Sequence, residues 1–328
     1  MAADMKIKSL APWFGGKRTL APRICAELGK HTQYFEPFAG SLAIILAKAP
    51  SQKETVNDLH GDMINLARVV ADRLAAEDLY DRLQRVVFSE GLIREAQWTL
   101  KDTPVPEGGC GPNAVERSYW YFLACWMGRN GTSGTARVDY QIAVRWTKNG
   151  GSPTVRFRNA ADSLPAWHRR LQNVVILRRD AFEILPRFED VPQTAIYADP
   201  PYTDESRGDK PGQTRCPDHR YQHEFRHAST LLDVSDHQRL HDVLATFREA
   251  RVVVSYYDCP RVRALYEGWT FVDCMMNKNL HAQNGRGARA KVAPEVLIIN
   301  GPSYTSTASS WRGPETAVPV EEGADDRP

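Results

Sequence analysis

Short apolar runs alternate along this chain with longer segments in which apolar residues recur at helical spacing. Strands that alternate with helices in this way favour a mostly parallel sheet that is covered on both faces, an α/β fold. The helix after the second run is expected to present Leu66, Val69, Val70 and Leu74 on one face. The expected strands lie within residues 32–36, 53–58, 173–180, 194–199, 250–258, 269–277 and 294–300.

The alternation fails between residues 67 and 174. This segment begins with the helical, aromatic stretch SYWYFLACWM and continues into a Gly-rich, basic stretch with hairpin character. We expect residues 67–174 to form an inserted, mainly helical domain, and residues 1–66 and 175–301 to form one discontinuous domain around it. Residues 302–328 are rich in Ser, Thr, Pro, Gly and acids and are expected to be a disordered tail.

The composition is that of a globular protein without a membrane span. Hydrophobic residues make up 42% of the chain and charged residues 25%. No apolar run approaches the ~20 residues that a transmembrane helix needs. The six cysteines are scattered without a C-x-x-C pair, which is typical of reduced thiols. We therefore expect a cytoplasmic protein that does not associate with membranes.

Acidic residues stand where several expected strands end: Glu36, Asp58, Asp180 and Asp199. Ligands of parallel sheets bind at the carboxyl ends of the strands, so these residues indicate a ligand site. A second interpretation exists for Asp58 and Asp180, because each precedes a helix and Asp is a common helix cap.

Gly40 lies in the turn between the first strand and its helix, where a glycine lets the backbone approach a ligand closely. Asp58, about twenty residues on, ends the next strand and can accept hydrogen bonds from a ribose diol, as in dinucleotide folds. The turn lacks the G-x-G-x-x-G spacing of a pyrophosphate site. An adenosine without phosphates fits better, and we expect S-adenosylmethionine as the cofactor.

The stretch Asp199-Pro200-Pro201-Tyr202 suits a flat exocyclic amine, as on adenine or cytosine. The carboxylate and a proline carbonyl can each accept one amine hydrogen, while proline has no N–H to compete. These bonds would draw the nitrogen toward tetrahedral geometry and make its lone pair a nucleophile for a methyl group. Tyr202 can stack on the base, which contributes about 1–3 kcal/mol. The stretch therefore favours an N-methyltransferase over a structural turn.

A base inside a duplex must rotate out of the stack before such a site can reach it, at a cost of a few kcal/mol. Residues 129–170 hold eight basic and two acidic residues, an excess that suits a polyanion. The candidate DNA-binding residues are Arg129, Asn130, Arg137, Arg145 and Lys148, and the basic set also includes Arg156, Arg158, Arg169 and Arg170.

The motifs, in this order, resemble those of the Dam-like, α-class DNA adenine-N6 methyltransferases. PWFGGK (12–17) is similar to the family's W-x-G-G-K motif, and FEPFAGS (35–41) to its cofactor motif. VNDLHGDMINL (56–66) resembles its acidic second motif, and ADPPY (198–202) its catalytic tetrapeptide. VVVSYYD and EVLIIN resemble its later strands, so the resemblance covers residues 12–300.

The resemblance implies a Rossmann-like, S-adenosylmethionine-dependent methyltransferase sheet with residues 67–174 as the target-recognition domain. It implies that Asp58 binds the ribose hydroxyls, that Asp180 accepts from the cofactor's adenine, and that Asp199 contacts the target amine. Tyr202 would stack on the flipped adenine. The implied cofactor site comprises Trp13, Lys17, Glu36, Phe38, Gly40, Asp58, Asp180 and Asp199.

The chain departs from the family pattern at two places. Leu42 stands where the family's nucleotide turn usually has a second glycine. In the recognition segment, Arg129 stands where an aromatic residue is common and Thr132 where leucine is common. Recognition of GATC is therefore not carried over to this chain.

We expect a site-specific methyltransferase that modifies the 6-amino group of adenine in double-stranded DNA, in a bacterial or phage-infected cell. No metal and no obligate protein partner are expected. Methylation of cytosine-N4 or of RNA poses the same chemical problem, and an inactive DNA-binding homologue is a further alternative. Cys216, His219, His223 and His227 have a spacing that could bind zinc, but their place after the tetrapeptide favours a loop over the substrate.

Overall fold

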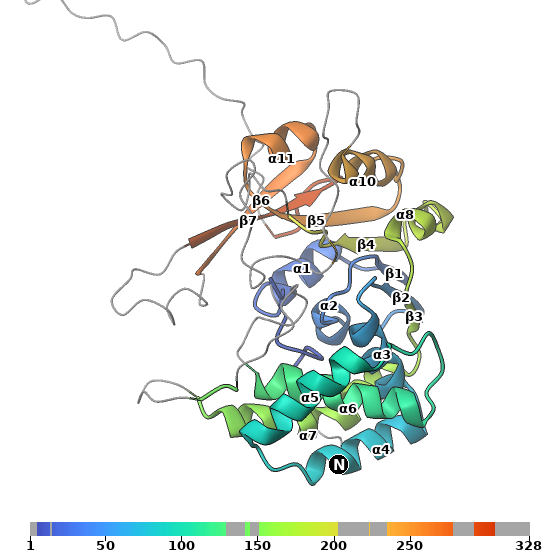
Figure 1. Ribbon diagram of the computed structural model, residues 1–328. Helices are drawn as coiled ribbons and strands as arrows, with labels where there is room; N and C mark the ends of the chain where they lie inside the picture. Colours follow the sequence, from blue (N-terminus) through green and yellow to red (C-terminus); the bar gives the residue numbers. More distant parts are fainter. Residues whose placement is uncertain are drawn as a thin grey trace, which may run out of the picture.

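A seven-stranded sheet forms the centre of the computed structural model (Figure 1). The structure describes residues 5–13, 15–128, 142–144, 151–202, 223, 235–277 and 292–305. Each strand overlaps its expected range, which confirms the α/β fold. The strands are β1 (Gln33–Glu36), β2 (Lys53–Asn57), β3 (Val175–Leu177), β4 (Thr194–Ala198), β5 (Arg251–Tyr257), β6 (Thr270–Asn277) and β7 (Val292–Ile299).

The sheet is mostly parallel, as the alternation predicts. Its strand order is β3-β2-β1-β4-β5-β7-β6. The first five strands pair in parallel, whereas β7 pairs antiparallel with both β5 and β6. All five residues of β4 are buried, as expected for the central strand of a sheet with both faces covered.

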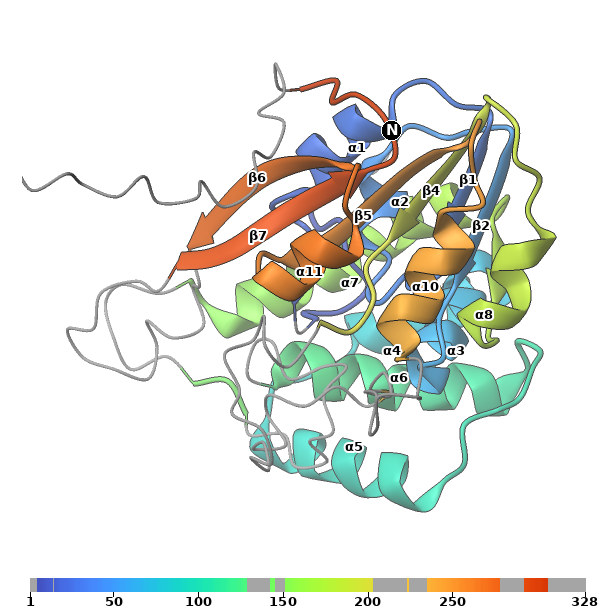
Figure 2. The same cartoon turned by 90° about the horizontal axis from the view of Figure 1, so that it is seen from above.

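Alternate strand residues point to opposite faces of the sheet and join two separate apolar clusters. Tyr34 and Tyr197 belong to the cluster that extends to the helices between β2 and β3. Phe35 and Ile196, their neighbours in sequence, belong to the cluster on the other face. Figure 2 shows the sheet between these two layers. The first layer includes α1 (Ala21–Leu28) and α2 (Ala43–Ala47), and the second includes α8 (Ala181–Ile184), η1 (Leu185–Arg187), α10 (Asp236–Leu244) and α11 (Pro260–Leu265).

The segment between β2 and β3 is helical, as expected. It packs as a bundle below the sheet in Figure 1. None of the helices in the described part of the chain combines the length and hydrophobicity of a membrane span. The bundle comprises α3 (Gly61–Ala71), α4 (Arg73–Gln84), α5 (Glu90–Asp102), α6 (Pro112–Met127) and α7 (Pro153–Leu171).

The expectation that Leu74 shares a buried helix face with Leu66 is wrong. Helix α3 ends at Ala71, and Leu74 lies in α4 with 75% of its surface exposed. The cause is Asp72, which is extended and whose side chain accepts a hydrogen bond from the Ala75 N–H. Such a cap starts a new helix in a new direction. Because α3 runs from Gly61 to Ala71, a domain boundary at residue 66 would fall inside it.

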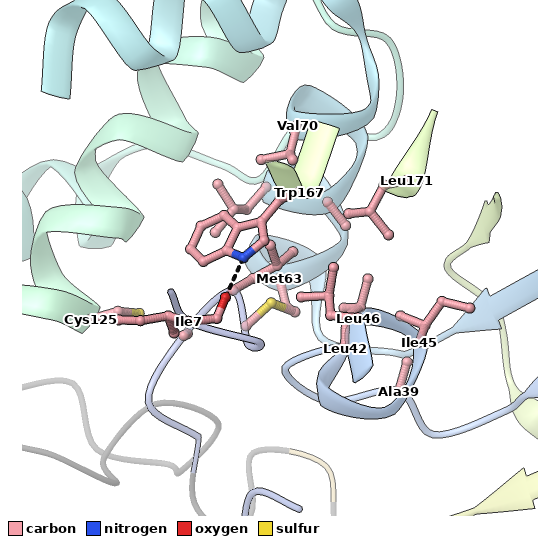
Figure 3. Packing of buried hydrophobic residues seen from close by; sticks show 14 of the residues in the cluster. Ile7, Ala39, Leu42, Ile45, Leu46, Met63, Val70, Cys125, Trp167 and Leu171 are labelled. Atoms are coloured by element: carbon pink, nitrogen blue, oxygen red, sulfur yellow. Dashed lines mark hydrogen bonds between the residues drawn. The ribbon is translucent and has the colours of Figure 1, made fainter. Parts of the chain in front are cut away.

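The core of the helical insertion is continuous with the core below the sheet. Figure 3 shows Trp167 of α7 among Met63, Val70 and Leu46, which come from α3 and α2. The Trp167 indole N–H also donates to the Ile7 carbonyl oxygen at 2.6 Å. The inserted helices therefore share their apolar packing with the sheet layer.

Part of the basic segment serves the internal structure. The Arg156 guanidinium donates to the carbonyl oxygens of Trp126 and Gly128, and Arg158 donates to the carbonyl oxygens that end α4 and follow it. Arg170 forms a buried ion pair with Glu54 of β2 at 2.6 Å. These three arginines belong to the basic segment that suits a polyanion, yet their guanidinium groups bind the protein itself.

The segment that follows α6 is described in part. Gly128 and Ile142 form an isolated antiparallel bridge, which agrees with hairpin character between them. Residues 153–157, which belong to the stretch expected to form the hairpin, lie instead in α7, where the Ser152 side chain caps the helix and Pro153 occupies its first turn.

Residues 302–305, which the sequence places in a disordered tail, are anchored to α1. The Ser303 hydroxyl donates to Glu27 Oε1 at 2.6 Å, and the Tyr304 N–H donates to Oε2 at 2.9 Å. Thr305 also donates to Oε1, and Arg251 forms an ion pair with this fully buried carboxylate. Glu27 needs these partners because an unpaired buried charge is strongly destabilising.

Leu42 adopts a left-handed backbone conformation at the start of α2. Its φ is 59°, and it is the non-glycine residue of the described chain with a positive φ. This conformation costs about 1–2 kcal/mol. The Leu42 side chain is fully buried and packs beside Ala39 and Leu46 (Figure 3), which contributes about 1.5–3 kcal/mol. Burial therefore offsets the absence of the glycine that is usual in the family.

Substitutions at Leu42 should reveal this strain. Leu42→Gly is expected to have a higher free energy of unfolding than Leu42→Ala, by ~0.5–1 kcal/mol, because glycine adopts a positive φ without steric cost. At Leu46, a buried position inside α2, the order should reverse, since glycine is worse than alanine in a helix. Urea unfolding of the four variants measures both differences. The same order at both positions would show that Leu42 is not strained.

Candidate active site

The site lies where the strand order reverses. From β1 the chain builds the sheet outward to β2 and β3, and from β4 it builds in the opposite direction. Glu36 ends β1, and Asp199 follows β4 on the adjacent strand. The carboxyl ends of parallel strands at such a reversal form the usual ligand site of these sheets.

Asn57 ties three strand ends together behind this edge. Its side-chain N–H groups donate to the Pro37 carbonyl at 3.0 Å and the Arg179 carbonyl at 2.9 Å, and its oxygen accepts from the Arg179 N–H. The Asn57 side chain is 1% exposed. These bonds fix the loops that follow β1 and β3 relative to β2, so the acidic residues on them have defined positions.

Asp58 holds the turn that contains Gly40. Its Oδ2 accepts from the Gly40 N–H at 2.7 Å, and its Oδ1 accepts from the His60 N–H at 2.8 Å. The side chain that caps α3 belongs to His60, so the helix-cap interpretation of Asp58 does not hold. A carboxylate has about four acceptor positions, which leaves capacity for a ribose diol; that role stays a prediction.

Trp13 packs directly against the Gly40 turn. A Cβ on Gly40 would lie 2.8 Å from Trp13 Nε1, and Gly40 has a φ of 47°, so this position requires glycine. The Trp13 ring meets His60 edge-on at 5.1 Å, and His60 lies 5.7 Å from the Tyr121 ring. The W-x-G-G-K, E-P-F-x-G and N-D motifs thus converge on one place.

Lys17 forms the centre of a buried charge network. Its ammonium lies 2.9 Å from Asp199 Oδ1 and 3.2 Å from Glu295 Oε1, and donates to the Gly15 carbonyl at 2.8 Å. The Ser255 hydroxyl of β5 also donates to Asp199 Oδ1, at 2.8 Å. Among the described residues both of these contacts to Asp199 fall on Oδ1, which leaves Oδ2 to accept from a substrate.

The pKa of Asp199 reflects its surroundings. Burial raises this pKa above its ordinary value, the Lys17 ammonium lowers it, and the Glu295 carboxylate raises it again. The side chain remains 21% exposed. Asp199 therefore sits at the boundary between the buried network and the exterior, where a ligand can reach it.

Tyr202, the last residue of the tetrapeptide, is held on the same network. Its hydroxyl donates to Glu295 Oε1 at 2.6 Å, and its ring lies 4.9 Å from the Lys17 ammonium. The rings of Tyr256 and Tyr257 pack against it. Tyr202 is 2% exposed, so stacking on a flipped base would require one face of the ring to be uncovered.

Glu36 is buried beneath this edge with 1% of its surface exposed. Its Oε2 accepts from the Tyr34 hydroxyl at 2.9 Å. Burial raises the pKa of Glu36 to about 8; the Tyr34 bond opposes this shift, and the Asp199 charge adds to it. Phe38, also predicted to bind the cofactor, is partly buried and packs against the apolar cluster of α8, α10 and α11.

Asp180 lies apart from the buried network. It is exposed, and its Oδ1 accepts from the Phe182 N–H at 2.9 Å as the N-cap of α8. The sequence is compatible with two roles for Asp180, a helix cap and a ligand of the cofactor's adenine. The structure contains the cap. A cap occupies one acceptor of the carboxylate, so the adenine role stays a prediction.

Several candidate residues lie outside the described residues. They are the DNA-binding candidates Arg129, Asn130, Arg137, Arg145 and Lys148, and the zinc candidates Cys216, His219 and His227. Within the described ranges no group of histidine, cysteine and acidic side chains is arranged to hold a metal ion.

The donor set fits a cationic nucleoside cofactor. Asp199 and Glu295 both contact the Lys17 ammonium, and Glu36 lies close enough to Asp199 for the two carboxylates to interact. Burial is the main cause of the raised pKa values of Glu36 and Asp199, and a neighbouring carboxylate adds to each shift; a cation bound beside these groups would favour their charged forms. S-adenosylmethionine has a positive sulfonium, and Asp58 beside the Gly40 turn suits its ribose.

Residues 13–280 match the family model of the D12 class N6 adenine-specific DNA methyltransferases. The chain belongs to this family. The methyltransferase modifies the 6-amino group of adenine in DNA, with S-adenosylmethionine as its methyl donor. Adenine, and not cytosine, is thus the target base of the family. A search of curated proteins found no match.

Sequence reasoning missed three residues of this enzyme's site: Asn57, Ser255 and Glu295. Ser255 lies in the run VVVSYY and Glu295 precedes the run VLII, so each is a lone polar side chain in an apolar strand. A buried polar group must be hydrogen-bonded, and this isolation was the signal that could have found them. Their partners could not be found in this way, because they come from distant parts of the chain.

The pKa of Glu36 predicts a pH dependence of stability. Glu36 ionises at its ordinary 4.5 in the unfolded chain but near 8 in the folded enzyme, so the unfolded chain binds fewer protons between these values. Its contribution to the free energy of unfolding should therefore fall as pH rises through this window, by at most ~1.4 kcal/mol per pH unit. Glu36→Gln, which cannot ionise, should gain stability relative to wild type from pH 5 to 8.

Urea unfolding of the cofactor-free enzyme at several pH values tests this expectation. Glu77→Gln is the matched control, since Glu77 is a 62% exposed glutamate of α4, and its difference from wild type should stay flat. Parallel pH profiles for Glu36→Gln and wild type would show that Glu36 ionises normally in the folded state.

Proposed function

We propose that Asp199 accepts a hydrogen from the 6-amino group of an adenine that has been rotated out of double-stranded DNA. The observation that carries this proposal is the network at the carboxyl end of β4, which binds Oδ1 of Asp199 through Lys17 and Ser255. These contacts orient Oδ2 of Asp199 while leaving it able to accept a hydrogen bond. Ionised Asp199 then stabilises the positive charge that develops on the amine nitrogen.

The neighbouring prolines complete the acceptor set. The Pro200 carbonyl oxygen can accept the second amine hydrogen, and neither Pro200 nor Pro201 has an N–H that would compete for it. Two acceptors on one side of the nitrogen direct its lone pair to the other. S-adenosylmethionine, when bound, supplies the electrophilic methyl group, and Trp13, Lys17, Glu36, Phe38, Gly40, Asp58 and Asp180 are the residues proposed to hold it.

The proposal extends to how DNA is engaged. An adenine paired within a duplex hides its 6-amino group in the stack, so the base must be flipped before Asp199 can reach it. Tyr202 is proposed to stack on the flipped base. Residues 67–174 are proposed as the target-recognition domain, with Arg129, Asn130, Arg137, Arg145 and Lys148 in contact with DNA.

The order of motifs supports placing the enzyme among the Dam-like, α-class methyltransferases. The motif that contains Trp13 and Lys17 comes first, the Gly40 and Asp58 motifs follow, and the tetrapeptide comes after the insertion. We further propose a cytoplasmic enzyme of a bacterium or phage, solitary or paired with a restriction enzyme, that acts without an obligate protein partner.

Asp199→Asn should separate chemistry from binding. The amide keeps the size of the side chain but removes the charge, so turnover should fall by about 10²–10³-fold, while duplex affinity stays unchanged. Transfer of labelled methyl groups to DNA measures the first quantity, and fluorescence anisotropy the second. Asp78→Asn, a surface carboxylate of α4, serves as the control. Turnover near the wild-type rate would remove Asp199 from the proposed chemistry.

Base flipping predicts a fluorescence signal. Methylation-sensitive sequencing of DNA from cells that express the enzyme first identifies the methylated site. A duplex with 2-aminopurine in place of the target adenine should then brighten several-fold on binding, because the base leaves the quenching stack. A probe one position away is the control. Equal brightness from free and bound target probe would contradict extrusion of the base.

A further inference from the structure

Glu295 is a charged residue in an otherwise apolar strand. It is 8% exposed, and the four residues that follow it in β7, Val296 to Ile299, are all at most 1% exposed. A carboxylate in such a place is strongly destabilising unless it is paired. An apolar residue at this position would bury the strand without that cost. The partners of Glu295 therefore indicate why a carboxylate is present.

One oxygen of Glu295 contacts the last residue of the catalytic tetrapeptide directly and the first residue through Lys17. Oε1 accepts from the Tyr202 hydroxyl at 2.6 Å and lies 3.2 Å from the Lys17 ammonium. The same ammonium lies 2.9 Å from Asp199 Oδ1. Lys17 thus links Glu295 to the first residue of the tetrapeptide, and the Tyr202 hydroxyl links it to the last.

We propose that Glu295 is a positioning residue for methyl transfer, which orients Tyr202 directly and Asp199 through Lys17. The inference rests on the roles proposed above for Asp199 and Tyr202. Glu295 touches neither substrate nor cofactor in this scheme. It acts by fixing the distance between the acceptor of the amine and the aromatic ring that receives the base.

The geometry has an electrostatic consequence that can be measured. Since Asp199 and Glu295 share the Lys17 ammonium, their bound oxygens lie no more than about 6 Å apart. The Glu295 charge raises the pKa of Asp199, and Asp199 must be ionised to accept from the amine. Within the described part of the chain, the groups that act on Asp199 or are affected by its charge also include Lys17, Glu36 of β1, Tyr197 of β4 and Tyr256 of β5, and the Ser255 hydroxyl donates to it.

The experiment compares Glu295→Gln and Glu295→Ala with wild type in full-length enzyme. Glutamine keeps an oxygen that can accept from Tyr202 and Lys17 but has no charge, whereas alanine removes both. Steady-state methyl transfer to duplex DNA gives kcat and the KM for S-adenosylmethionine across a range of pH. Asp273→Asn, a 66% exposed carboxylate of the neighbouring strand β6, is the matched control.

Glu295→Ala is expected to lower kcat about 10–100-fold through misplacement of the acceptor and ring, with little change in the KM for the cofactor. Glu295→Gln should restore most of kcat. In the pH profile of kcat for Glu295→Gln, the acid limb, where Asp199 becomes protonated, should move to lower pH by about 0.5–1 unit. The reason is that removal of the Glu295 charge leaves Lys17 to favour ionised Asp199. Asp273→Asn should match wild type in both respects.

Two results would overturn the inference. One is a kcat for Glu295→Ala equal to that of wild type. The other is an acid limb that does not move in Glu295→Gln, which would make Glu295 a structural residue whose loss merely reduces the amount of folded enzyme. Asp199→Asn, measured alongside, distinguishes the two proposals. If this variant stays active, the proposed role of Asp199 fails. If it is inactive while the Glu295 variants are unaffected, only the proposed role of Glu295 fails.

Discussion

The buried ammonium of Lys17 is the interaction on which the site depends. It is 6% exposed and contacts Asp199 and Glu295, which approach the sheet edge from strands that lie on either side of β5. Without a cation between them, two carboxylates at this separation would repel, and one of them would take up a proton. Lys17 thereby opposes protonation of Asp199 and brings the segment before α1 to the end of β4 and the first half of β7.

The part of the site proposed to hold the cofactor depends on close backbone packing. The Trp13 ring packs so close to Gly40 that no side chain would fit at that position. The Gly40 N–H donates a hydrogen bond to the Asp58 carboxylate. Leu42, two residues on, adopts a conformation that glycine would adopt more easily, and its burial compensates. A departure from the family's glycine pattern is therefore compatible with the same turn. The free energy gained by burying the Leu42 side chain in the apolar contacts of α2 offsets the cost of its left-handed backbone conformation.

The strands and the acidic residues at their ends could be predicted because period and residue type are local properties. Glu36, Asp58 and Asp199 lie where a parallel sheet places ligand-binding residues. The pairing of side chains could not be predicted in the same way. Arg156, Arg158 and Arg170 have the same charge as a DNA contact, yet they bind carbonyl groups and Glu54 inside the protein. Charge along the sequence does not distinguish these two uses.

The amino-acid sequence alone establishes the α/β alternation, the family motifs and the tetrapeptide from Asp199 to Tyr202, since each is a pattern within a few neighbouring residues. Tertiary structure alone decides that Glu295, 93 positions from Tyr202, meets its hydroxyl, and that Lys17 lies between two carboxylates. Strand order determines these contacts: β7 lies next to β5 and antiparallel to it, which brings the start of β7 to the edge where β4 and β5 end. No local pattern encodes that order, because it results from how the whole sheet is buried.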